Sequence, residues 1–210
     1  MRAYEQMVGR DGKEVMLFPL THLYVTQGEN GSYSHQGILA IDFVEWNNGQ
    51  VYNAPMYAPC SCRCVAIISG SDNGRVFQSL NKVHTPTGLK YVTFMCFHDN
   101  NPIASVGSIF NQGEVFAHTG TAGNVTGDHT HFNTADGSYA GWEHVPPDNH
   151  GQLVNSSHIY ETCYVNDTTI VVGYGYNWVN YSGGITPSKY RKMTSFPWVL
   201  YARKLRDKHI

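Results

Sequence analysis

The residues best suited to chemistry lie in one short stretch of the sequence, Gly127-Asp128-His129-Thr130-His131-Phe132. If this stretch is extended, successive side chains point to opposite faces, so His129 and His131 point the same way. Two imidazoles on one face suit a site in which one histidine binds zinc through a ring nitrogen while the other handles protons. The alternative is two surface or hydrogen-bonded histidines in a strand, and the pair alone does not decide between them.

A second candidate pair, His35 and Asp42, comes earlier in the chain. Asp42 stands in the run Leu39-Ala40-Ile41-Asp42-Phe43, which is otherwise apolar. A carboxylate in such a run is costly to bury unless it is paired, hydrogen-bonded or bound to a metal. His35 follows the segment Gln27–Ser32, which is rich in glycine and asparagine and is expected to be a loop. Both are therefore candidate metal ligands, and a turn aspartate with an exposed loop histidine is the alternative.

The elements that must position these side chains are predicted to be strands. Leu23–Thr26 and Val76–Leu80 are short strand candidates, as is Val15–Phe18, and Lys90–Phe97 predicts a long buried strand with His98 at its end. Glycines at short intervals before His129 indicate small hairpins, and no helix is expected before the C-terminus. The predicted fold is mainly β, a compact antiparallel sandwich or barrel with a short C-terminal helix.

Three alternating cysteines, Cys60, Cys62 and Cys64, would share one face of a strand. No fourth thiolate or histidine stands at a short spacing, so they are not a zinc-finger pattern, and we expect buried core positions instead. Five cysteines, an odd number, argue against a complete disulfide framework and fit a reducing compartment.

Composition narrows the classes of function. A length of 210 residues suits one sizeable domain, and a net charge of −2 gives no general attraction to nucleic acid. We find no apolar run long enough to span a membrane. The first residues lack the hydrophobic segment of a secretory signal, so we expect synthesis in the cytoplasm.

The motifs also occur in an order that resembles the lysostaphin-like zinc endopeptidases, the M23 or LytM-type peptidases. The resemblance covers roughly residues 30 to 135. It consists of His35 with Asp42, the segment ending at His98, the stretch His118-Thr119-Gly120, and the closing segment with His129 and His131. His35 and Asp42 are seven positions apart, whereas many family members have four, and the longer spacing resembles that of bacteriophage-encoded members.

The resemblance implies a lysostaphin-like fold in which His35, Asp42 and His131 bind one zinc ion (Zn2+). His129 would be the general base and His98 the oxyanion or acid partner, with these two roles exchangeable. The implied function is a zinc metalloendopeptidase that hydrolyses peptide crosslinks or stem peptides of bacterial peptidoglycan, as in a phage lysin or a virion-associated wall hydrolase. The alternatives are an inactive binding or assembly module of a virion, and a metal-independent structural virion protein.

Two regions are expected along the chain, a peptidase domain over 1–160 and a C-terminal extension over 161–210. The extension is predicted to be strand-like near Thr169–Val172 and an amphipathic helix over Trp198–Lys208. Half of the lysines and arginines, seven of fourteen, fall between Lys189 and Lys208. This segment could bind anionic wall polymers or a membrane surface, although a solvated helix face is the alternative.

Overall fold

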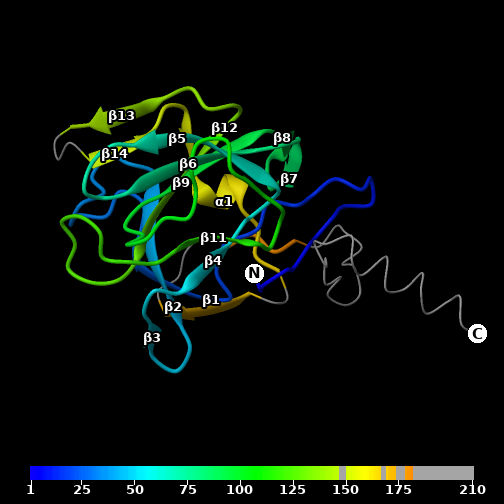
Figure 1. Cartoon of the computed structure of the whole chain (residues 1–210). Helices are drawn as coiled ribbons and strands as arrows, with labels where there is room; N and C mark the ends of the chain where they lie inside the picture. The colour runs from blue at the N-terminus through cyan, green and yellow to red at the C-terminus, as the bar shows by residue number, and fades with distance from the viewer. Residues whose placement is uncertain (147–149, 167–168, 174–177, 182–210) are drawn as a thin grey trace, which may run out of the picture.

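The computed structural model describes residues 1–146, 150–166, 169–173 and 178–181 (Figure 1). A ten-stranded sheet dominates it, with the strand order β10-β5-β6-β9-β12-β2-β1-β16, while β15 pairs with β12 and β3 with β2. Its strands are β1 (His22–Gln27), β2 (Ala40–Trp46), β3 (Gln50–Val51), β5 (Cys62–Ile68), β6 (Gly74–Ser79), β9 (Val92–Cys96), β10 (Ile109–Phe110), β12 (Thr130–Asp136), β15 (Ser156–Ser157) and β16 (Ile170–Gly173).

Three two-stranded sheets complete the fold. They pair β4 (Pro55–Tyr57) with β11 (Val115–His118), β7 (Val83–Thr85) with β8 (Gly88–Lys90), and β13 (Trp142–Val145) with β14 (His150–Leu153). Every described strand pair is antiparallel except β1 with β16, which is parallel. The predicted mainly β, antiparallel class is confirmed.

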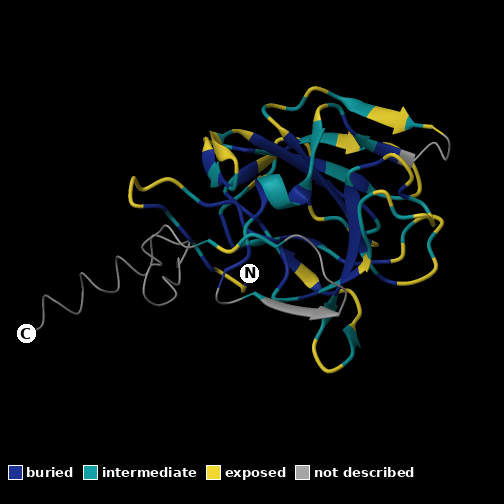
Figure 2. Cartoon of the chain, turned by 180° about the vertical axis from the view of Figure 1, so that it is seen from behind, coloured by how far each residue is buried: buried dark blue, intermediate teal, exposed yellow. Residues whose placement is uncertain are grey.

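Strand alternation explains how this sheet separates core from site. In β2, Ile41 and Phe43 are buried in the main core, where Phe43 packs against Phe18 and Phe132. Asp42 lies between them in sequence and therefore points to the other face of the sheet. Figure 2 shows the buried strands inside the molecule, with exposed residues gathered on loops and on the outer hairpins.

The cysteines behave as small core residues. All five are buried and free, and all five belong to the main core cluster around Phe77 and Phe94. The prediction that Cys60, Cys62 and Cys64 are core positions is confirmed, because their side chains are 0% exposed.

One local strand prediction was wrong. Val15–Phe18 forms only isolated bridges, from Val15 to His84 and from Leu17 to Tyr164, so it is not a regular strand. The single helix among the described residues, α1 over Ile159–Thr162, is short and follows the main strands, as the predicted fold class has it. A single helical turn has too few residues to produce a detectable apolar period.

The C-terminal extension is described only in part. β16 adds to the same sheet as β1, and the helix predicted over Trp198–Lys208 lies outside the described residues. The division of the chain at residue 160 stays a prediction. Within the described part of the chain, no helix combines the length and apolar character needed to cross a bilayer.

Candidate active site

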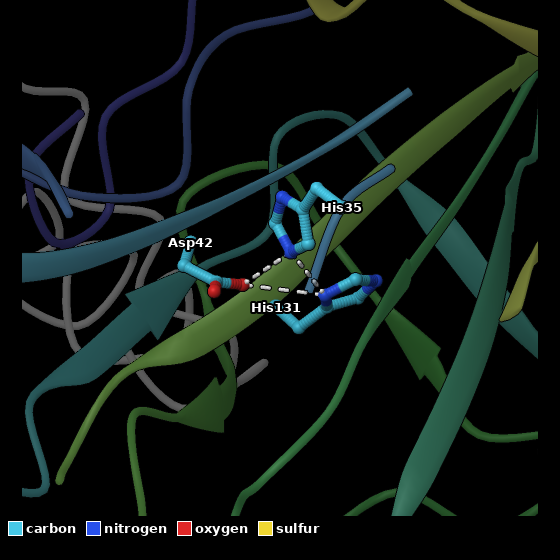
Figure 3. Close-up of side chains that lie close together, drawn as sticks. All are labelled: His35, Asp42 and His131. Atoms are coloured by element: carbon cyan, nitrogen blue, oxygen red, sulfur yellow. Dashed lines mark hydrogen bonds and ion pairs between the residues drawn. The ribbon is translucent and has the colours of Figure 1, made fainter. Parts of the chain in front are cut away.

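Two neighbouring strands and one loop bring three candidate ligands together. The antiparallel register of β12 and β2 sets His131 opposite Asp42, and His35 approaches from the loop between β1 and β2. Asp42 Oδ1 lies 3.2 Å from His35 Nε2 and 3.2 Å from His131 Nδ1, and these two nitrogens are 3.1 Å apart (Figure 3). The seven-residue spacing of His35 and Asp42 is therefore compatible with one shared site.

The three atoms fit a tetrahedral divalent metal. Ligands held about 2.0 Å from a tetrahedral zinc ion lie about 3.3 Å from one another, close to the separations found here. Asp42 Oδ1 is buried, and neither nearby ring nitrogen meets it with hydrogen-bond geometry. His35 Nδ1 donates a hydrogen bond to the carbonyl of Gly28 at 3.0 Å, so the lone pair of Nε2 faces the other two ligands.

The electrostatics favour the ligand forms of these groups. Burial raises the pKa of Asp42, but its contacts with His131 and His35 outweigh that effect and hold the pKa well below its usual range. Burial lowers the pKa of His131, against the opposing influence of Asp42. At neutral pH the centre thus offers one carboxylate and a neutral imidazole, as a cation requires.

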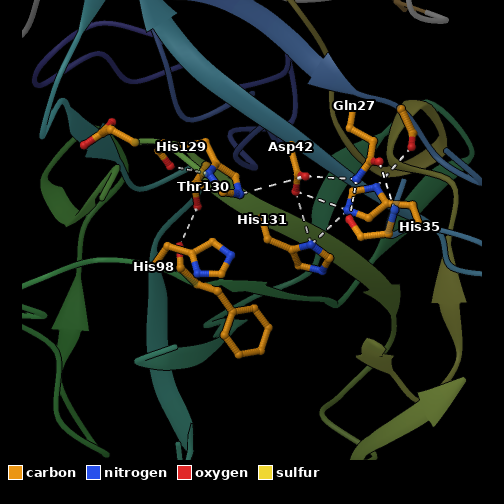
Figure 4. A network of polar contacts seen from close by, with 12 residues as sticks. Gln27, His35, Asp42, His98, His129, Thr130 and His131 are labelled. Atoms are coloured by element: carbon orange, nitrogen blue, oxygen red, sulfur yellow. Dashed lines mark hydrogen bonds and ion pairs between the residues drawn. The ribbon is translucent and has the colours of Figure 1, made fainter. Parts of the chain in front are cut away.

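His98 and His129 form a second pair beside the three ligands. Their ring centroids are 4.6 Å apart, and His129 Nε2 lies 3.9 Å from Asp42 Oδ2 (Figure 4). His98 Nδ1 donates to the carbonyl of Ala122 and His129 Nδ1 to that of Gly127, each at 2.8 Å. Because a neutral imidazole carries one proton, both rings keep Nε2 as a proton acceptor.

Burial, followed by the nearby His129, lowers the pKa of His98 to about 4. His98 is therefore neutral near pH 7 and can accept a proton there. It becomes a hydrogen-bond donor through Nε2 only after it has been protonated. The assignment of His129 as base and His98 as oxyanion partner stays a prediction.

An unusual backbone conformation places His98. Its φ is +80°, which few residues other than glycine adopt. Its amide donates to the carbonyl of Asp72 at 2.8 Å, and its carbonyl accepts from the amide of Ala122 at 3.0 Å. Outliers of this kind gather at functional sites, where the surrounding structure holds them in place.

Gly120 connects the two histidines through the backbone. It exchanges two hydrogen bonds with His129, amide to carbonyl in both directions, each 3.0 Å long. A Cβ atom at this position would lie 2.1 Å from the carbonyl oxygen of His98. Only glycine therefore lets the strand segment that carries His129 approach the end of the segment that carries His98.

Aromatic side chains support the ring of His131. Phe97 lies edge-on to it at 5.6 Å, and Trp142 of the β13–β14 hairpin packs on Phe97 at 5.4 Å. Gly74 leaves room for this contact, because a Cβ there would meet the Phe97 ring at 2.3 Å. The site is more open at His129, whose side chain is 16% exposed, than at His35, whose side chain is 1% exposed.

The structure thus brings all five predicted site residues into one neighbourhood. Sequence reasoning missed Gln27 and Gly120, which contact or position them. Gln27 falls in a stretch predicted to be loop, and nothing local to the sequence indicates that its amide reaches Asp42. Gly120 was noticed only as part of a motif, and its close approach to His98 depends on the tertiary structure.

Comparison with known proteins finds a relative among bacteriophage proteins. No protein-family model matches the sequence. Morphogenesis protein 1 of Bacillus phage B103 is 39% identical over 174 residues, which are 81% of this chain and 45% of that protein. The chain therefore spans less than half the length of this relative.

Three solved structures illustrate the structural similarity. A zinc-containing peptidase from Vibrio cholerae has a TM-score of 0.42 at 15% identity, over 62% of this chain and 43% of that one. The catalytic domain of a prophage-encoded M23 protein from Enterococcus faecalis scores 0.41 at 16% identity, over 55% and 82%. The catalytic domain of lysostaphin from Staphylococcus simulans scores 0.39 at 18% identity, over 54% and 79%.

Proposed function

We propose that this protein is a zinc metalloendopeptidase that hydrolyses amide bonds in the peptide part of bacterial peptidoglycan. The observation that carries the proposal is the convergence of His35 Nε2, Asp42 Oδ1 and His131 Nδ1 beside two further imidazoles. Three nitrogen and oxygen ligands leave one position open on a tetrahedral ion, which is typical of catalytic rather than structural zinc sites.

Three residues would bind the metal ion, and two histidines would transfer protons. His35, Asp42 and His131 would hold the ion, whose Lewis acidity would polarise a peptide carbonyl and make water a better nucleophile. His129 and His98 present Nε2 as proton acceptors, so one of them would take the proton of the attacking water. The same imidazoles, once protonated, would stabilise developing negative charge and return a proton to the leaving amine.

The choice of peptidoglycan as substrate rests on two supports. The order of motifs resembles that of wall-degrading zinc endopeptidases, and the relative at 39% identity is a bacteriophage protein. A phage needs to open the wall of its host, so a lysin or a virion-associated hydrolase is the context that we propose.

A second candidate function is an assembly module of a virion, with this fold but without catalysis. The name of the phage relative, a morphogenesis protein, favours it. The two candidates make different demands on the site. Assembly needs neither a proton acceptor at His129 nor a bound metal ion, whereas hydrolysis needs both.

Wall hydrolysis by wild type and by the His129→Ala variant tests the proposal. We expect wild type to release new amino groups from purified walls, and the variant to lose about 10²- to 10⁴-fold in rate while it keeps its zinc. His84→Ala is the matched control, because His84 pairs with Asp11 outside the site. Wild type that binds zinc but leaves walls of several peptidoglycan types intact would favour the assembly module.

A further inference from the structure

The two oxygens of the Asp42 carboxylate face different partners. Oδ1 faces the two histidine ligands, whereas Oδ2 accepts a hydrogen bond from the side-chain amide of Gln27 at 3.1 Å (Figure 4). Asp42 is 8% exposed, so its carboxylate has little water with which to exchange this contact. Gln27 thereby fixes which oxygen turns toward the metal position.

An irregularity in β1 puts Gln27 in this place. Val25 pairs with Phe43, but the next pair along the strands is Gln27 with Asp42, so Thr26 is an extra residue in β1. In a regular antiparallel ladder Thr26 would stand opposite Asp42. A β-bulge re-aims side chains in this way, and here it moves Gln27 onto the face that carries the site.

The same side chain also holds the loop that carries His35. Gln27 Nε2 donates to Ser34 Oγ at 2.7 Å, and Gln27 Oε1 accepts from the amide of Ser34 at 3.1 Å. Ser34 directly precedes His35 in the chain. Gln27 therefore links Asp42, a candidate ligand on strand β2, to the loop that carries His35.

We propose that Gln27 is a positioning residue that pre-organises Asp42 and His35 for a divalent metal ion. The inference rests on the proposed function, because it concerns the metal centre of that same site. A neutral amide suits the task, since it orients the carboxylate and leaves its negative charge available to the cation. Gln27 has no part in proton transfer.

Loss of a hydrogen bond that orients a metal ligand typically weakens metal binding about 10- to 100-fold. Gln27→Leu keeps most of the side-chain volume and removes every hydrogen bond. Gln27→Asn keeps an amide but is one methylene shorter and cannot span Asp42 and Ser34 together. We expect both variants to bind zinc about 10- to 100-fold more weakly than wild type.

The experiment is competition for zinc between the purified protein and a chromophoric chelator, with thermal unfolding of the metal-free protein as the check on folding. Gln36→Leu is the matched control, because Gln36 lies in the same loop, is exposed, and donates its side-chain amide to the carbonyl of Ser32 away from the site. Its zinc affinity should equal that of wild type. Ser34→Ala should have a smaller effect than Gln27→Leu, because the Asp42 contact remains.

The outcomes separate this inference from the proposal on which it rests. Wild type that binds one zinc ion, with Gln27→Leu and Gln27→Asn within threefold of its affinity, would overturn the role of Gln27 alone. Wild type that binds no zinc would overturn the metal centre itself, and the inference with it. If Gln27→Leu does not fold, Gln27→Asn decides the question.

Discussion

A methyl group added at Gly120 should disable the site without touching a metal ligand. In Gly120→Ala the new Cβ would lie 2.1 Å from the carbonyl oxygen of His98, whereas real Cβ atoms essentially never approach within 3.0 Å. The two segments must therefore separate by at least about 0.9 Å, and His98 or His129 must move with them. A misplacement of about 1 Å can cost about 100-fold in rate.

We accordingly expect Gly120→Ala to lower kcat/KM for wall hydrolysis by about 100-fold. Overpacking of this kind typically costs about 1–3 kcal/mol of stability, which corresponds to about 2–12 °C in the midpoint of thermal unfolding for a domain of this size. Zinc content should stay the same, because the two hydrogen bonds to His129 and the contact with His98 involve none of the three ligands.

The assay combines zinc content, thermal unfolding and the rate of amino-group release from walls, all on the same preparation. Activity within threefold of wild type, in a folded variant with its zinc, would refute the role given to Gly120. Loss of zinc together with activity would also contradict the reasoning, because it would place the damage at the ligands.

Two further predictions concern protonation and thiol chemistry. Because the pKa of His98 falls from 6.5 to about 4 on folding, the folded state binds fewer protons than the unfolded state between these pH values. The free energy of unfolding of the metal-free protein should therefore fall by up to about 3 kcal/mol, through His98, as pH falls from 6.5 to 4. His98→Asn, in which asparagine tolerates the positive φ, should flatten this part of the curve of unfolding free energy against pH; an identical slope would contradict it. The five buried cysteines, with pKa values raised by burial, should not react with a thiol reagent in native protein but should all react in denaturant, and rapid labelling of native protein would disprove their burial.

The sequence was sufficient for those features that depend on local pattern and residue chemistry. Alternation in the β2 segment separates Asp42 from Ile41 and Phe43, and the same period puts His129 and His131 on one face. An aspartate within an apolar strand needs a partner, which is why Asp42 could be proposed as a ligand before its neighbours were known.

Other features depend on contacts between distant segments. The bulge at Thr26 changes which side chain faces Asp42, and nothing in the local sequence signals the shift in register. The positive φ of His98 is imposed by its contacts with Asp72 and Ala122. The parallel pairing of β16 with β1 joins residues far apart in the chain, so local periodicity could not predict it.

The most direct test of the metal centre is the zinc content of purified wild type and of His131→Ala, measured beside their hydrolysis of bacterial walls. We predict about one zinc ion per chain in wild type, and the loss of both zinc and hydrolysis in the variant, because His131 Nδ1 is one of the three converging ligand atoms. Wild type without stoichiometric zinc, or a variant that keeps both its zinc and its activity, would contradict the account.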